Sequence, residues 1–204
     1  MSVTPPETDD VLFGRLREGQ EAAFVELYRR RQGAIYRYVL HMSRSQAVAE
    51  DIAQEVFLAL LREGCGFDPD RGTLSGYLFG IARKLLLRQI ERGRVDVPLE
   101  ADVEDAAMPE LAVESDVLED LTRREGIEAL RRAVATLPRR YREVVVLCDL
   151  EEVDYADAAR VLGCPIGTVR SRLHRARALL LDKLHHERRP APSVSTLNPI
   201  RCLT

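Results

Sequence analysis

Residues 154–181 read DYADAARVLGCPIGTVRSRLHRARALLL, and this stretch decides how the C-terminal part of the chain folds. Asp154 is a typical helix cap, and Gly163 frees the backbone where the capped helix has to stop. Ala159, four residues before that glycine, is small enough for two steeply crossing helices to touch there. A second helix is predicted from about Ile166. The stretch therefore predicts a helix-turn-helix.

The second helix of this motif has an apolar face and a basic face. At 100° per residue, one side carries Val169, Leu173, Ala176 and Leu180, and the other carries Ser171, His174, Arg175 and Ala178, flanked by Arg170 and Arg177. Between Ala158 and Leu181 there are five arginines and no acid. Such a face suits the major groove of DNA, where arginine pairs with guanine edges. An ordinary solvent-exposed helix is the alternative, which the combination of cap, glycine, small residue and one-sign charge disfavours.

Helical periodicity continues on the N-terminal side of this motif. Apolar stripes at helical spacing are separated by breaks at 41–44 and 64–72, and Pro138 suits the first turn of a further helix. No alternating pattern typical of strands competes, so the fold class is predicted to be all-α. The stripes are Phe24, Leu27, Tyr28, Ile35 and Val39; Ile52, Val56 and Leu60; Leu74, Leu78, Ile81 and Leu85; and Ile127, Leu130, Val134 and Leu137.

Charge divides the chain into three parts. Residues 95–120 contain ten acids and no lysine or arginine, whereas residues 1–94 carry a net charge of +1 and residues 121–204 of +6. An acidic, proline-containing segment of this kind buries too little surface to offset its ordering entropy. We therefore predict two small helical domains, at 10–94 and 123–187, joined by a flexible acidic linker at 95–122 and followed by a disordered tail at 188–204.

Several classes of protein are disfavoured. The longest apolar runs are far shorter than a membrane span, and the acidic start of the chain lacks a secretory signal, so we expect a cytoplasmic protein without membrane insertion. The four cysteines lack C-x-x-C spacing and are expected to be thiols rather than zinc ligands. FDPDR at 67–71 is interpreted as a turn and not a metal site. Without a phosphate-binding loop or nucleophile motif, we expect no enzyme, no cofactor and no small-molecule substrate.

Two groups of motifs resemble the extracytoplasmic-function sigma factors, which are subunits of bacterial RNA polymerase. GTVRSRLHRAR at 167–177, preceded by LPRRYREVVVLCDLEEVDYADAARVLG at 137–163, is similar to their promoter-binding region 4. Three stretches of the N-terminal part resemble the helices of region 2, in the same order. They are AAFVELYRRRQGAIYRYV at 22–39, AEDIAQEVFLALL at 49–61 and RGTLSGYLFGIARKLLLRQIERGR at 71–94. Two domains joined by a linker are also that family's architecture.

The resemblance implies roles for three sets of residues. Upstream promoter DNA would contact Arg170, Ser171, His174, Arg175 and Arg177. Downstream single-stranded DNA would contact the basic helix after Ile81 and the aromatic side chain before it, namely Tyr77, Arg83, Lys84, Arg88 and Arg92. The clamp helices of the largest polymerase subunit would contact the exposed patch Asp51, Gln54 and Glu55. The family often has Trp near Tyr77 and Asn at the position of Lys84, so the resemblance does not specify which base is captured.

The family also implies partners: core RNA polymerase through its clamp helices and its flap, promoter DNA, and an anti-sigma factor. The acidic linker is interpreted either as a nucleic-acid mimic inside the polymerase or as a soluble tether only. A helix-turn-helix transcriptional regulator without a polymerase-subunit role is the alternative function, because response-regulator-type DNA-binding helices share the GTV start. The absence of a β/α alternation before residue 95 disfavours that alternative.

Overall fold

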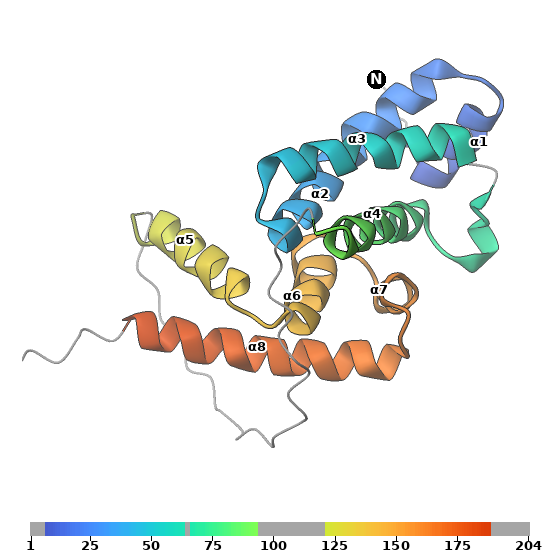
Figure 1. Ribbon diagram of the computed structural model, residues 1–204. Helices are drawn as coiled ribbons and strands as arrows, with labels where there is room; N and C mark the ends of the chain where they lie inside the picture. Colours follow the sequence, from blue (N-terminus) through green and yellow to red (C-terminus); the bar gives the residue numbers. More distant parts are fainter. Residues whose placement is uncertain (1–6, 64–65, 94–120, 189–204) are drawn as a thin grey trace, which may run out of the picture.

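The computed structural model describes residues 7–63, 66–93 and 121–188, and these ranges are helical apart from short connections (Figure 1). No strand occurs within them, which confirms the all-α prediction. The elements in chain order are α1 (Asp9–Arg17), α2 (Glu21–Ser43), α3 (Gln46–Glu63), the 3-10 turn η2 (Pro69–Arg71), α4 (Leu74–Glu91), α5 (Leu121–Ala135), α6 (Arg139–Val145), the π-helical turn η3 (Val146–Leu150), α7 (Tyr155–Leu162) and α8 (Ile166–Arg188).

The N-terminal helices pack largely as their apolar stripes predict, although Tyr28 of the first stripe is 36% exposed. α2 and α3 lie against each other, and α4 packs on both. Ile52, Val56 and Leu60 of α3 are fully buried, each worth about 2 kcal/mol of transfer free energy. α4 begins at a cap formed by Thr73, whose hydroxyl accepts a hydrogen bond of 3.1 Å from the Gly76 amide. FDPDR forms the turn η2 before that cap.

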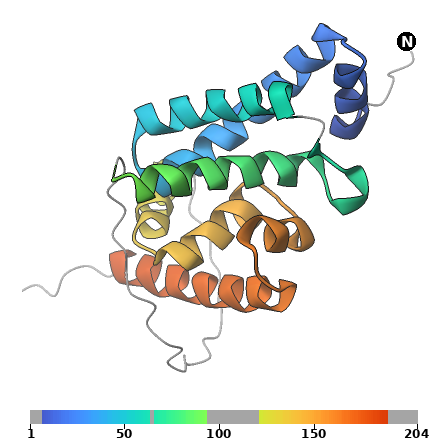
Figure 2. The ribbon, with the colours of Figure 1, turned by 45° about the vertical axis from the view of Figure 1, so that its right-hand side comes forward.

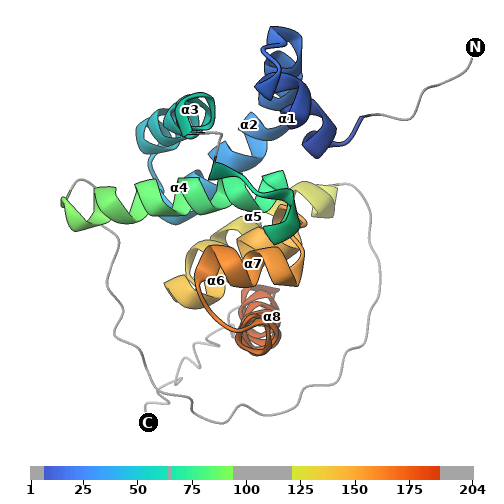
Figure 3. The ribbon, with the colours of Figure 1, turned by 90° about the vertical axis from the view of Figure 1, so that its right-hand side faces the viewer.

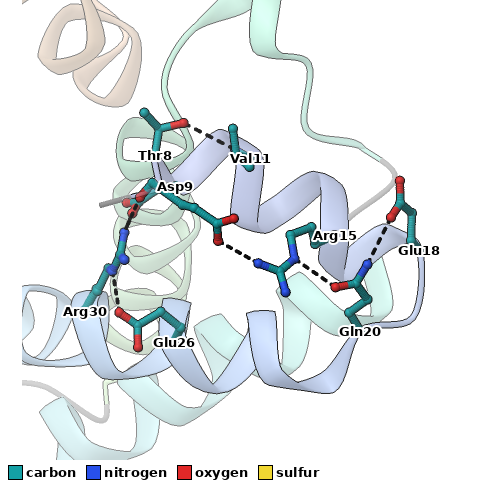
Figure 4. A network of polar contacts seen from close by, with 9 residues as sticks. Thr8, Asp9, Val11, Arg15, Glu18, Gln20, Glu26 and Arg30 are labelled. Atoms are coloured by element: carbon teal, nitrogen blue, oxygen red, sulfur yellow. Dashed lines mark hydrogen bonds and ion pairs between the residues drawn. The ribbon is translucent and has the colours of Figure 1, made fainter. Parts of the chain in front are cut away.

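Helix α1 was not expected from the sequence. It is capped by the Thr8 hydroxyl, and Leu12 and Phe13 bury its apolar side. Polar contacts also hold the α1–α2 corner, since the Arg15 Nε donates to Gln20 Oε1 at 2.8 Å and Arg30 pairs with both Asp9 and Glu26 (Figure 4). Further contacts of this corner are Arg15 with Glu7, Arg30 with the Glu7 carbonyl, Gln20 with Glu18, and Arg31 with Asp9.

The C-terminal helices form a second group around α8. α5, α6 and α7 all pack on α8, whose stripe of Val169, Leu173, Ala176 and Leu180 is buried as predicted. The stripe predicted for α5 is only half correct. Val134 and Leu137 are buried, whereas Ile127 and Leu130 are 44% and 37% exposed, because the start of α5 projects beyond its neighbours.

The two groups of helices pack directly against each other, a contact that the sequence did not predict. α7 lies along α4, and the C-terminal end of α2 contacts α6 and η3. In Figure 2, α4 lies between α2 and α3 on one side and α6 and α7 on the other, with α8 on the outer face. Figure 3 shows the same order from another direction. The buried side chains of both groups form one continuous hydrophobic cluster.

The expected linker and tail lie almost wholly outside the described residues, although α5 begins at Leu121 and α8 extends to Arg188. Among the residues that are described, none of the helices combines the length and the apolar character that crossing a membrane requires.

Candidate nucleic-acid and protein interfaces

The helix-turn-helix is formed by α7 and α8. The Asp154 carboxylate accepts a 2.8 Å hydrogen bond from the amide of Asp157 and caps α7, as the sequence predicts. Gly163 ends α7 in the left-handed region with φ of 67°, where a glycine carries no Cβ penalty. The turn therefore fixes the direction in which α8 leaves, and it sends α8 along the outer face of the molecule.

The outer face of α8 displays the residues expected to meet DNA. Arg170, Ser171 and His174 are exposed, and Arg175 is half-buried at the edge of this face. The hydroxyl of Ser171 donates a 3.1 Å hydrogen bond to the Thr168 carbonyl, one turn earlier. α8 lies on the outer side of the molecule, away from the N-terminal helices, and these residues are open to solvent, so a nucleic acid can approach them.

Arg177, on the flank of α8, is held by an acid that the sequence analysis did not single out. Its Nη2 and Nε lie 2.6 and 3.1 Å from the two carboxylate oxygens of Asp149 in the turn η3. This bidentate hydrogen bond raises the pKa of the Arg177 guanidinium, which stays charged. A phosphate would have to compete with Asp149 for this side chain.

A cavity of about 500 Å³ lies beside α4 and includes the expected single-strand residues Tyr77, Lys84 and Arg88. Lys84 and Arg88 are exposed one turn apart on α4, and Arg92 is exposed just after its last residue. The ring of Tyr77 packs against Phe67 with 5.5 Å between centroids. An aromatic ring therefore stands beside two cations, a combination that suits stacked bases and phosphates. We refer to this cavity as the α4 groove.

Arg83 does not belong to the α4 groove. Its Nε donates to Glu143 Oε1 of α6 at 2.8 Å, and the same oxygen accepts a 2.9 Å hydrogen bond from the hydroxyl of buried Tyr38. Arg83 is thus engaged in the contact between the two groups of helices. Glu143 gave no signal in the sequence, because its partners are 60 and 105 positions away.

The far wall of the α4 groove comes from the C-terminal helices. Asp157, Arg160 and Val161 of α7 line it together with residues of α4 and η2. Sequence reasoning placed Asp157 and Arg160 only within the helix-turn-helix. Among the described residues, no cluster of three or more His, Cys, Asp and Glu side chains is arranged to hold a metal ion.

The polar patch on α3 is exposed. Asp51, Gln54 and Glu55 all lie on the solvent side of α3, while the neighbouring Ile52 and Val56 are buried. Glu55 has a long ion pair of 3.8 Å with Arg62 on the same helix and borders the α4 groove. α3 packs on α2 and α4 through its buried side, so the three residues of the patch remain open to solvent.

Two family matches cover the parts of the chain that carry these surfaces. Residues 27–95 match the family Sigma-70 region 2, and residues 127–180 match Sigma-70, region 4. The first match contains α3 and α4, and the second contains α6 to α8 up to Leu180. The α3 patch and the α4 groove thus belong to region 2, and the outer face of α8 belongs to region 4.

Curated relatives match most of the length of this chain. The ECF RNA polymerase sigma factor SigE of Mycolicibacterium smegmatis is 35% identical over 160 residues, 78% of this chain, and the chain spans 60% of that relative. The ECF RNA polymerase sigma factor SigW of Bacillus subtilis is 30% identical over 83% of this chain and 93% of its own length. The ECF RNA polymerase sigma-E factor of Escherichia coli K12 is 30% identical over 87% and 94%.

Solved structures share the fold. The sigma factor RpoE in complex with the anti-sigma factor NepR from Bartonella quintana matches with a TM-score of 0.56 and 26% identity over 77% of this chain and 93% of that one. CnrH in complex with the cytosolic domain of CnrY matches with a TM-score of 0.64 over 89% of this chain and 99% of that one, and at 23% identity this is a likeness of fold. Taken with the matched regions and relatives, these likenesses show that the chain belongs to the ECF RNA polymerase sigma factors.

Proposed function

We propose that this sigma factor binds core RNA polymerase and directs it to promoters through two separate nucleic-acid surfaces. The outer face of α8 would read the upstream element in the major groove, with Arg170, Ser171, His174 and Arg175 at base edges and Arg177 at the backbone. The chain would act by binding alone, without catalysis of its own. The alternative of a regulator outside the polymerase is not favoured, because region 2 accompanies the helix-turn-helix.

The α4 groove would hold the separated strand of the downstream element. Tyr77 offers a ring on which a base stacks, and Lys84, Arg88 and Arg92 offer charges to the phosphates along the same helix. Arg83 would join them only after it leaves Glu143. One observation carries the proposal. The same chain has an exposed basic helix, α8, and a groove beside α4 that combines an aromatic ring with cations.

The protein partners follow from the same surfaces. The α3 patch of Asp51, Gln54 and Glu55 would dock on the clamp helices of the largest polymerase subunit, and region 4 would contact the flap. An anti-sigma factor is a further expected partner, since a sigma factor with 26% identity is solved in complex with one. The acidic segment at 95–120, outside the described residues, would thread the polymerase interior, where ten carboxylates occupy a basic channel until RNA displaces them.

In vitro transcription tests this proposal. The purified chain is added to core polymerase on a promoter library, and the start sites are mapped by sequencing the transcripts. New start sites that share an upstream and a downstream element are expected, and core polymerase alone is the control. A regulator outside the polymerase, or an enzyme, would add no start sites to those of the core alone.

A further inference from the structure

A row of three aromatic rings links the N-terminal helix α1 to the α4 groove. Phe13 of α1 meets Phe67 edge-on, with 5.1 Å between the ring centroids and 88° between the ring planes. Phe67 packs in turn against Tyr77 at 5.5 Å, and Tyr77 lines the groove. Edge-on and offset pairs at such distances are favourable arrangements of aromatic side chains. The row therefore connects a helix that contributes no residue to the lining of the groove with the ring inside it.

Phe67 anchors the connection that forms one rim of the α4 groove. Within residues 66–71, Phe67 is the only buried residue, with 6% of its surface exposed. Gly66 of the same connection also lines the groove, and a Cβ built on it would lie 3.4 Å from the hydroxyl oxygen of Tyr77. A short connection with a single buried side chain takes its position from the neighbours of that side chain. Phe13 is one of these neighbours.

Helix α1 is itself held in place. Leu12 and Phe13 are each 3% exposed, and the helix packs on both α2 and α4, at the end of the molecule where α4 begins (Figure 1). The polar contacts of the α1–α2 corner, such as the ion pair of Asp9 with Arg30 at 3.5 Å, attach the same helix through its polar side (Figure 4). Protein interiors are close-packed, so a ring fixed in this way restricts the rings that touch it.

We propose that α1 positions Tyr77 for the DNA strand, with Phe13 as the positioning residue and Phe67 as the link between them. Phe13 contacts Phe67 and does not line the groove, so its effect on DNA passes through the other two rings. An aromatic ring that is already held in place loses less freedom when a base stacks on it, which makes binding tighter. That a base stacks on Tyr77 rests on the proposed function, whereas the support of its ring by α1 does not.

Phe13→Ala and Leu12→Ala form a matched pair of variants to test this. The two side chains are neighbours on α1 with the same exposed fraction of 3%, so both variants leave a cavity and both should destabilise the helix. Phe13 belongs to the row of rings, and Leu12 does not. Phe13→Leu is a third variant, because it removes the ring but keeps an apolar side chain of similar size in the core.

Tyr77→Trp provides a reporter for the position of the ring, because the chain contains no tryptophan of its own. Acrylamide quenching of this single indole is measured in the full chain without DNA, with and without each α1 substitution. The same substitutions in the chain with Tyr77 intact are titrated with a labelled single strand of about 12 nucleotides, and binding is followed by anisotropy. Circular dichroism sets a temperature at which every variant is folded.

We expect Phe13→Ala to raise the quenching constant about twofold and to weaken single-strand binding about fivefold, with smaller changes of the same sign in Phe13→Leu. Leu12→Ala should keep both values of its parent chain, although it unfolds at a lower urea concentration. Equal effects of Phe13→Ala and Leu12→Ala, or a change in only one of the two readouts for Phe13→Ala, would overturn the proposal. If the unsubstituted chain bound no strand, the proposed function would fail instead, and quenching would still decide whether α1 supports the ring.

Discussion

At the scale of single residues, Tyr38 is one of the side chains that link the two regions, and its hydrogen bond is buried. Its hydroxyl donates to Glu143, and burial together with that carboxylate raises its pKa well above the usual value. Tyr38→Phe removes the hydrogen bond and keeps the ring contact with Phe79 at 5.5 Å. We expect the free energy of unfolding to fall by about 1–2 kcal/mol, measured by urea denaturation.

Tyr36→Phe is the matched control for this variant. Tyr36 is on the same helix, is only half-buried, and makes no hydrogen bond through its hydroxyl in the described part of the chain. Its replacement should change the free energy of unfolding by less than about 0.5 kcal/mol. Equal losses in the two variants would mean that the contact between Tyr38 and Glu143 contributes nothing to stability.

His41, near the end of α2, should make stability depend on pH. Burial lowers its pKa, and so do the charges of Arg131, Arg142 and Arg37 around it. The folded state therefore disfavours protonation, whereas an unfolded histidine titrates near pH 6.5. Between that value and the lower folded pKa, the unfolded state binds more protons, so the stability contribution is complete above pH 6.5 and is lost as the pH falls.

The comparison that isolates this effect is wild type against His41→Gln. Urea midpoints are measured from pH 7.5 down to pH 5, where other groups titrate equally in both proteins. As the pH drops below 6.5, the wild type should lose more stability than the variant. A difference that stays constant over this range would show that His41 titrates normally in the folded chain.

At the scale of elements, α8 is expected to contact both the bases and the phosphates of the upstream DNA. Substitutions at different positions of this helix should separate the two kinds of contact. Arg175→Ala is expected to relax the preference at one or two upstream bases, because an arginine at a guanine edge discriminates by about 1–3 kcal/mol. Arg177→Ala should weaken binding to all sequences alike and reduce the salt slope by about one unit. His174→Ala should shift the preference less than Arg175→Ala. Selection from a randomised upstream element measures all three.

The contact of Arg177 with Asp149 adds a control to this series. Asp149→Asn weakens the bidentate pair and leaves Arg177 available to a phosphate, so binding should tighten for every sequence without a change of preference. Circular dichroism confirms that each variant remains helical. An unchanged consensus for folded Arg175→Ala would mean that α8 is aimed differently in the groove.

Local signals explain which elements the sequence could predict. The cap at Asp154, the stop at Gly163 and the α8 stripe all depend on neighbours within a few positions, and all three are confirmed. Helix α1 was missed although Thr8, followed by two acids and then Leu12 and Phe13, is a readable cap and apolar stripe. Periodicity alone predicted burial for all of the α5 stripe, but burial also needs a neighbour, which the start of α5 lacks.

At the scale of the whole molecule, the sequence predicted which helix faces are exposed but not how the helices are arranged. The exposed residues of α8 and of α3 follow from helix geometry, because each lies opposite a buried stripe. The engagement of Arg83 by Glu143 and the position of Asp157 over Thr73 depend on pairs 60 and 84 positions apart. Neither pair leaves a local pattern in the sequence. The positive charges along α4 look alike there, so the sequence could not show that Arg83 pairs with Glu143 while Lys84 and Arg88 stay exposed.

The exposed α3 patch makes a prediction about assembly with the polymerase. Asp51, Gln54 and Glu55 lie on the solvent side of α3, so Gln54 is open to a partner. Gln54→Ala should weaken binding of core polymerase by about tenfold, as loss of an interface hot spot does. This affinity is measured as the dissociation constant of the labelled full chain with core polymerase.

Gln32→Ala is the matched control, since Gln32 is an exposed glutamine on the neighbouring helix α2. It should bind core polymerase like the wild type. If Gln54→Ala alone loses affinity, the polymerase contacts α3 and not α2, because the two variants remove the same exposed side chain from neighbouring helices. Equal affinity of both variants and the wild type would mean that the polymerase docks on another surface of region 2.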